Sequence, residues 1–257
     1  MSRLLGHRSG DGSFGEQVNY TSFAILALRS TGRSARDPVL HSAARWLVRQ
    51  EDHDRGFGFG TRGASSDVDD TAAAVQALIA AGQRSGAPVA RAIGFIVSHQ
   101  NPDGGFPLAP GAESNAQSTA WAVQGLVATG RDPDSVHRGG GRSPMGYLRS
   151  LQQSDGSVRY SPTSAQTPVW VTAQALTALA RAPFPIRAPV RGQGGRSSRP
   201  SGRAPGASRG RAHGRRRHHA HAAGSRAGGR PWPPAQVSAW VRGAGVLTGL
   251  MLGPLGA

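Results

Sequence analysis

The sequence predicts an all-α fold of repeated helical hairpins, with about seven helices alternating between an outer and an inner layer. Three observations predict it. A turn pattern occurs four times, an amphipathic segment with one large aromatic residue precedes the last three turns, and an Ala-rich apolar segment follows every turn. The apolar spacing is that of helices, and no segment shows a convincing strand pattern.

The turns are marked by an Asp followed by glycine within two residues, at Asp11, Asp54, Asp103 and Asp155. The four aspartates are 43, 49 and 52 residues apart, a period at which helical hairpins repeat. Glycine suits such a turn because it adopts positive φ without steric cost. The apolar residue after each turn is expected to fill the core below it; these residues are Phe14, Phe57, Phe106 and Val158.

The segments before the last three turns, residues 43–50, 91–100 and 146–153, predict outer helices that end near a glutamine. Each carries one aromatic residue at an equivalent place, and these residues are Trp46, Phe95 and Tyr147. They are expected to face the inner layer. Only eight residues precede the first turn region, too few for an outer helix of the same length.

The segments after the turns begin near Thr21, Thr71, Thr119 and Thr172 and predict inner helices. Small residues on all sides of these helices favour burial with close backbone approach. The first three run into a glycine suited to a helix C-terminus, and the last stops before Pro183.

One inner helix opens with an acidic cluster, Asp67-Val68-Asp69-Asp70, that the other copies lack. Three carboxylates so close together repel one another, which raises the pKa of at least one, and a protonated carboxyl group can act as a general acid. Helix capping is the alternative, with Ser66 or Asp67 as N-cap and the acids favoured by the helix dipole. Polar residues also stand at the equivalent place in neighbouring helices, as caps would; the aligned residues are Asn19, Asp69 and Gln117.

The stretch from Gln100 to Phe106, and more loosely that from Gln50 to Phe57, resembles the QW motif of the prenyltransferase and squalene-cyclase repeat superfamily. The resemblance covers residues 1–183 and implies an α/α toroid, with inner helices around a central cavity. Three and a half hairpins correspond to an arc or incomplete toroid. The stretch 67–72 is similar to the Asp-x-Asp-Asp motif of class II terpene cyclases, including the Thr and Ala that follow it.

That resemblance implies a protonation-initiated isomerase. Asp69 would protonate an alkene or epoxide of a polyprenyl substrate, and Asp67 and Asp70 would flank and polarise it. Aromatic faces would stabilise the resulting cations, and the candidates are Trp121, Trp170 and Phe23. The apolar cavity would be completed by a second toroid domain or by another copy of the chain.

We expect no cofactor and no metal. Cys is absent, and no turn continues as a calcium-binding loop ending in Glu. A second function class stays open: a non-catalytic toroid module that binds a ligand or protein partner in its concave face. That reading predicts an open groove with Asp67, Asp69 and Asp70 exposed.

All 14 acidic residues lie within residues 1–181, so the formal charge of +16 arises mainly from the Arg-rich region that follows. Residues 184–240 predict a disordered basic linker that would make weak, salt-sensitive contacts with anionic membrane or nucleic acid, and in the second function class it would tether the binding module. Residues 241–257 end in a short apolar segment, too short for a spanning helix and suited to a weak interfacial anchor. The N-terminus has no signal-peptide pattern, which predicts a cytoplasmic protein by default, with membrane association through the C-terminus.

Overall fold

The computed structural model describes residues 2–84 and 86–186 of the 257-residue chain. These residues form eight α-helices and one short 3₁₀ helix, and their only β-type pairing is in isolated bridges. The elements are α1 (Ser2–Leu5), α2 (Val18–Ser30), α3 (Pro38–Arg49), α4 (Val68–Ala80), α5 (Ala87–Ser98), α6 (Ala116–Ala128), η1 (Pro133–Ser135), α7 (Pro144–Ser150) and α8 (Pro168–Leu179).

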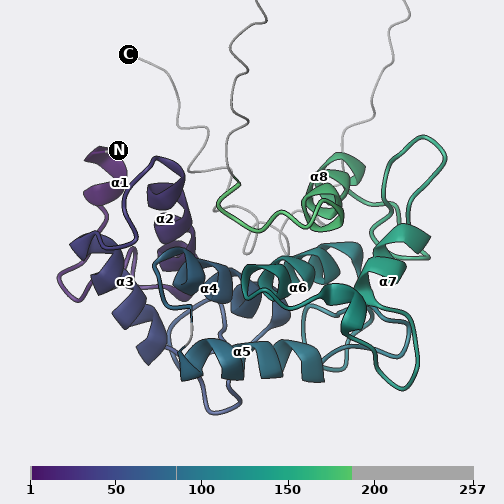
Figure 1. Cartoon of the computed structure of the whole chain (residues 1–257), viewed down its shortest axis with the longest axis horizontal. Coiled ribbons are helices and arrows are strands. Elements are labelled where there is room, and N and C mark those ends of the chain that lie inside the picture. The colour runs from purple at the N-terminus through teal and green to yellow at the C-terminus, as the bar shows by residue number, and fades with distance from the viewer. Residues whose placement is uncertain (1, 85, 187–257) are drawn as a thin grey trace, which may run out of the picture. The chain divides into compact units, whose positions relative to one another are not determined.

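The seven predicted helices correspond to α2 through α8, and the structure adds the four-residue α1 and η1. Helices α2, α4, α6 and α8 pack side by side in that order as the inner layer. Helices α3, α5 and α7 form the outer layer, each in contact with two successive inner helices (Figure 1). The alternation predicted from the sequence is therefore confirmed. Within the described part of the chain, no helix has the length and apolar character needed to cross a membrane.

Each turn is closed by its own aspartate and tied to the inner helix that follows. The aspartate side chain accepts the backbone N–H of the residue two positions later, at 2.9 Å in all four turns. The hydroxyl of the inner-helix threonine accepts the N–H of the apolar residue after the turn, at 2.9–3.0 Å, in the pairs Phe14–Thr21, Phe57–Thr71, Phe106–Thr119 and Val158–Thr172. These threonines therefore have a structural role that every repeat shares.

The outer-layer aromatics pack against the turns of the preceding repeat. A Cβ on Gly56 would lie 2.8 Å from the Phe95 ring, and one on Gly105 would lie 2.9 Å from the Tyr147 ring. Side chains larger than hydrogen therefore do not fit at these glycines. The predicted burial of Trp46, Phe95 and Tyr147 is confirmed, since none is more than 4% exposed.

The two QW-like stretches differ in structure. The Gln100 side chain is buried and donates hydrogen bonds to the carbonyl oxygens of Gly104 (3.0 Å) and Val136 (3.2 Å), which ties the end of α5 to its turn. The Gln50 side chain instead donates to Trp46 O in its own helix, and its Oε1 accepts the N–H of Arg62. The stretch from Gln100 to Phe106, which matches the QW motif more closely, therefore has a glutamine side chain bonded to its turn, and the stretch from Gln50 to Phe57 does not.

The inner helices end as predicted at glycines with positive φ, at Gly32, Gly82 and Gly130. Helix α8 ends differently, with Arg181 in the left-handed region (φ 51°). From there the chain turns back, and residues 182–186 pass over the inner helices (Figure 1). The predicted domain boundary at residue 183 falls inside this packed segment, and the rest of the predicted linker and the apolar C-terminal segment lie outside the described residues.

Candidate functional site

The acidic cluster lies at the N-terminus of α4, between the N-terminal turns of α2 and α6. Asp67 is the N-cap, and its Oδ1 accepts the backbone N–H of Asp70 at 2.7 Å. Asn115 caps α6 in the same way by accepting the N–H of Ser118 at 2.8 Å. Of the two predicted caps, Ser66 and Asp67, the structure therefore assigns the cap to Asp67, and an amide serves equally well in the next repeat.

Asp70 faces the preceding inner helix and is 6% exposed. Asn19 Nδ2, from the first turn of α2, donates a hydrogen bond to Asp70 Oδ1 at 2.6 Å. Burial raises the pKa of Asp70, and the hydrogen bonds from Asn19 and Asp67 oppose that rise. The Asn19 amide therefore favours the ionised form of Asp70.

The pKa of Asp67 is raised to about 10, chiefly by desolvation on burial and also by the negative charges of Asp70 and Asp69. Two neighbouring carboxyl groups that cannot both ionise share one proton. The pKa of both groups is raised, and the Asn19 amide favours the ionised form of Asp70. Asp69 does not take part in the hydrogen bond that links Asp67 and Asp70.

Asp69 is the carboxyl group best suited to give up a proton. Its Oδ1 is buried and finds no hydrogen-bond partner among the described residues. Burial raises the pKa of Asp69 to about 7; a hydrogen-bonding interaction with the Ser118 side chain lowers it and the charge of Asp70 raises it. Tyr160, from the loop after the fourth turn, lies near enough for Asp69 to contribute to its raised pKa. A group with a pKa near 7 is populated in both protonation states at neutral pH, as a general acid requires.

Two of the three predicted aromatic residues come together. The Phe23 and Trp121 rings meet edge to face with centroids 5.8 Å apart, and Trp121 is 7% exposed. They come from equivalent positions of α2 and α6 and flank Ala73 of α4. Trp170 does not join this pair: it lies in the first turn of α8 and is 40% exposed.

Phe184 is a further aromatic member, with its ring centroid 5.8 Å from that of Trp121. Sequence reasoning missed it because it follows the last helix, beside two prolines. It also missed the partners of the acids, Asn19, Ser118 and Tyr160. The sequence held one signal for Asn19, because Asn19 aligns with Asp69 in the repeat. The alignment shows only that a polar residue recurs at this position. The packing of α2 on α4 shows that Asn19 contacts the acidic cluster, through Asp70.

Helical geometry places Asp69 on the same face of α4 as Ala73 and Gln76, because residues four and seven apart lie above one another. Asp69 therefore begins a stripe that continues along the inner helix toward the segment 182–186, where Gln76 Oε1 accepts the N–H of Phe184.

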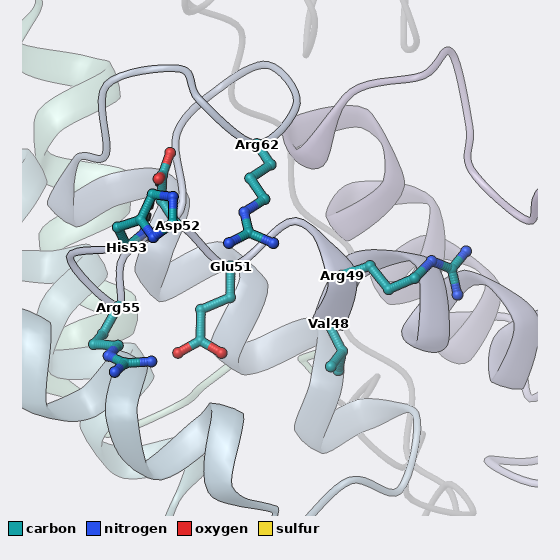
Figure 2. Close-up of a pocket in the computed structure, with 7 residues that line it drawn as sticks. All are labelled: Val48, Arg49, Glu51, Asp52, His53, Arg55 and Arg62. Atoms are coloured by element: carbon teal, nitrogen blue, oxygen red, sulfur yellow. Dashed lines mark hydrogen bonds between the residues drawn. The ribbon is translucent and has the colours of Figure 1, made fainter.

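A separate polar pocket of about 220 Å³ lies at the end of α3 (Figure 2). Two adjacent acids line this pocket. Glu51 pairs with Arg91, and Asp52 accepts hydrogen bonds from the N–H groups of His53 and Gly63. The three acids of the α4 cluster do not line it. The lining residues are Val48, Arg49, Glu51, Asp52, His53, Arg55 and Arg62.

Comparison with known proteins agrees with this architecture. Residues 8–110 match the family model of the squalene-hopene cyclase C-terminal domain, and residues 88–180 match that of the prenyltransferase α/α toroid domain. Among solved structures, the apo type II terpene cyclase MstE from Scytonema superposes with a TM-score of 0.54 at 19% identity, covering 70% of this chain and 55% of that one.

Two curated relatives extend the comparison. Drimenyl diphosphate synthase of Streptantibioticus cattleyicolor is 28% identical over 188 residues, which are 69% of this chain and 35% of that protein. Squalene–hopene cyclase of Bradyrhizobium diazoefficiens is 32% identical over 115 residues, 40% of this chain and 17% of that protein. The chain spans about a third or less of the length of these relatives. The two family models together span residues 8–180, and with the repeats and the two-layer helical packing they support membership of the prenyltransferase and squalene-cyclase α/α-toroid superfamily.

Proposed function

We propose that this protein is a class II terpene-cyclase-type isomerase in which Asp69 protonates an alkene or epoxide of a polyprenyl substrate. The observation that carries the proposal is the Asp69 carboxyl group itself. The residue is half-buried, its Oδ1 is buried without a partner among the described residues, and desolvation raises its pKa to about 7. A carboxyl group serving only as a surface cap has no need of these properties.

In the proposed step, the Asp69 O–H proton forms a new C–H bond with one carbon of the alkene, using the electron pair of the double bond. The adjacent carbon becomes a cation, and Asp69 is left as a carboxylate. The next double bond of the substrate then attacks the cation, and the cascade ends when a proton is lost or water adds. The Asp67–Asp70 pair carries one negative charge beside Asp69, which supports the cation by electrostatic attraction.

Phe23 and Trp121 are the residues we assign to the stabilisation of the cation. Aromatic faces attract positive charge, and the effect grows when water is excluded. Ala73 lies between the two rings in the repeat alignment, and its small side chain is buried. Trp170 contributes to the same role only if the substrate reaches the first turn of α8.

The relatives favour a polyprenyl substrate. Two carry the names drimenyl diphosphate synthase and squalene–hopene cyclase, and MstE has been solved with geranylgeranyl dihydroxybenzoate as its substrate. We therefore assign this chain the same broad substrate class, an apolar chain of isoprene units.

The test incubates the purified full chain in deuterated buffer with squalene and, separately, with geranylgeranyl diphosphate, followed by mass spectrometry. We expect a cyclised product that carries one deuterium delivered by Asp69, and no such product from Asp69→Asn. Gln117→Ala is the matched control, because Gln117 holds the equivalent position on α6, and it should retain activity. Product from Asp69→Asn, or none from the folded wild-type protein with either substrate, would contradict the proposal.

The second candidate function is a non-catalytic module that binds a ligand or protein partner in its concave face. One observation favours it: residues 182–186 already occupy that face and are held there through their main chain. The acidic cluster does not favour it, because a binding module of this kind predicts exposed acids, whereas Asp70 is buried and Asp67 and Asp69 are half-buried. Tight binding of a prenyl compound without turnover, unchanged in Asp69→Asn, would favour the module.

A further inference from the structure

The segment of residues 182–186 lies against the inner helices after α8 ends (Figure 1). Gln124 Nε2 on α6 donates a hydrogen bond to Ala182 O at 3.0 Å. The N–H of Phe184 donates one to Gln76 Oε1 on α4 at 2.8 Å. The segment, which we call the strap, therefore crosses from α6 to α4.

The two glutamines form a matched pair. They hold equivalent positions in neighbouring repeats, and both are fully buried. Gln76 Nε2 donates to Ala72 O of its own helix at 3.3 Å, which leaves Oε1 facing the strap. The Gln76 carboxamide accepts from the N–H of Phe184, and the Gln124 carboxamide donates to the carbonyl oxygen of Ala182, two residues earlier in the strap. Buried polar groups need such partners, so in the absence of the strap these amides would need another ligand or water.

The strap also fills an apolar position. The Phe184 ring packs on Trp121, which in turn packs on Phe23, so that one row of three rings crosses the inner layer. Trp121 and Ala73 lie about one helical turn nearer the acids than Gln124 and Gln76. Phe184 thus covers the part of the face that we assign to cation stabilisation.

The anchor at the start of the strap is exposed to water. Arg181 pairs with Asp132 at 2.7 Å and with Asp134 at 2.6 Å, and all three side chains are at least 37% exposed. Exposed ion pairs contribute little to stability and are screened by salt. Apart from the hydrogen bond from Ala182 N–H to Thr177 O, which closes the end of α8, release of the strap therefore means giving up the two glutamine hydrogen bonds and one ring contact.

The strap and a polyprenyl chain would need the same surface. Asp69, Ala73 and Gln76 share one face of α4, and the distance from Asp69 to Gln76 is about 10 Å along the helix axis. A prenyl chain with its reacting end at Asp69 that extends along this face reaches Phe184 within two turns.

We propose that the inner face of α4 and α6 is the site for an extended apolar chain and that residues 182–186 are its resident occupant, which the ligand displaces. This inference rests on the proposed function for the class of ligand. It assigns a new role to Gln76, Gln124 and Phe184: they hold the site closed against water until a prenyl chain arrives.

The experiment measures binding of geranylgeranyl diphosphate to the full chain and to Phe184→Ala, with Ile186→Ala as the matched control because Ile186 is in the strap but 46% exposed. We expect Phe184→Ala to bind the probe about tenfold more tightly, since removing a competing occupant raises the competent fraction. Ile186→Ala should bind like the wild type. Gln124→Met, which removes the hydrogen bond to Ala182 at similar volume, should act in the same direction as Phe184→Ala.

Amide hydrogen exchange of the strap gives a readout that does not depend on catalysis. Residues 182–186 have only three exchanging amides, because Pro183 and Pro185 lack N–H. The probe should speed exchange at Phe184 in the wild type. Equal affinity in all variants with unchanged exchange would overturn the strap proposal and leave the proposed function standing. No binding to wild type or Phe184→Ala, with circular dichroism showing both folded, would overturn both.

Discussion

At the scale of single residues, the three carboxyl groups of the α4 cluster differ in what each contacts. Asp67 caps the helix, Asp70 accepts from Asn19, and Asp69 Oδ1 is buried without a partner among the described residues. Capping and acid chemistry, which the sequence left as alternatives, are thus separated by residue: Asp67 serves the helix, and Asp69 is the member available for proton transfer.

The cap makes a first prediction. Asp67→Ala should lower the free energy of unfolding by about 1 kcal/mol at pH 6, while Asp67→Asn should change it by less than about 0.5 kcal/mol, because an amide oxygen accepts the same N–H. Urea denaturation measures both. Asn115→Ala, at the equivalent cap of α6, should resemble Asp67→Ala. If Asp67→Asn proves as destabilising as Asp67→Ala, capping is not what Asp67 contributes.

The raised pKa of Asp69 makes a second prediction. Its folded-state pKa of about 7 lies above the ordinary aspartate value of 3.8, so between these pH values the folded state keeps a proton that the unfolded state has released. The free energy of unfolding should therefore fall as pH rises from about 4 to 7, by up to about 1.4 kcal/mol per pH unit. Asp69→Asn should reduce this dependence by the share of Asp69 and be more stable than wild type at pH 7, while the raised pKa values of Asp67 and Asp70 leave a residual slope.

Denaturation of both proteins at pH 4, 5, 6 and 7 tests this directly. Asp155→Asn is an informative control. The hydrogen bonds from Ser157 lower the pKa of Asp155, so its contribution to stability is lost as pH falls and has the opposite sign. Parallel curves for wild type and Asp69→Asn would show that Asp69 has no raised pKa.

At the scale of elements, the threonine of each inner helix explains part of the sequence pattern. The Thr that follows the acids, Thr71, has counterparts in all four repeats, and each accepts the N–H of the residue after its turn. Its presence beside the Asp-x-Asp-Asp stretch therefore reflects the repeat, and the acids alone distinguish this copy.

This hydrogen bond makes a third prediction. Thr119→Val should lower the free energy of unfolding by about 1–3 kcal/mol, because the buried N–H of Phe106 loses its acceptor. Thr177→Val is the matched control on α8: its hydroxyl only donates to Gln174 O in the same helix, and the change should cost less than about 0.5 kcal/mol. Equal losses in the two variants, measured by urea denaturation, would refute the structural role.

At the scale of the whole described unit, stability depends on the contact of each inner helix with its neighbours. Helix α6 packs against α4, α8, α5 and α7, and Gly125 allows its close approach to α4. A Cβ at Gly125 would lie 3.4 Å from the Cβ of Ala72 and 3.5 Å from Cδ1 of Ile96. The site is built across these contacts, because its residues come from α2, α4 and α6.

The fourth prediction follows from this packing. Gly125→Leu should lower the free energy of unfolding by about 1–3 kcal/mol through overpacking between α4 and α6, and it should weaken prenyl binding. Gly94→Ala is the control, since a Cβ on Gly94 of α5 meets nothing within 4 Å. It should stabilise the protein by about 0.5–1 kcal/mol because alanine is the better helix former. A thermal or urea melt that finds Gly125→Leu neutral would contradict the close approach of α4 and α6.

The amino-acid sequence alone predicts the two-layer helical repeat, the turn positions, the helix ends at Gly32, Gly82 and Gly130, and the resemblance to the superfamily. These follow from local chemistry, since turn formation, capping and apolar periodicity act between residues close together in the chain. Tertiary packing is needed to show which acid has a buried oxygen without a partner among the described residues, that Asn19 supports Asp70, and that Phe184 packs on Trp121. These contacts join residues on different repeats, up to 108 positions apart for Phe184 and Gln76, and no periodic pattern encodes them.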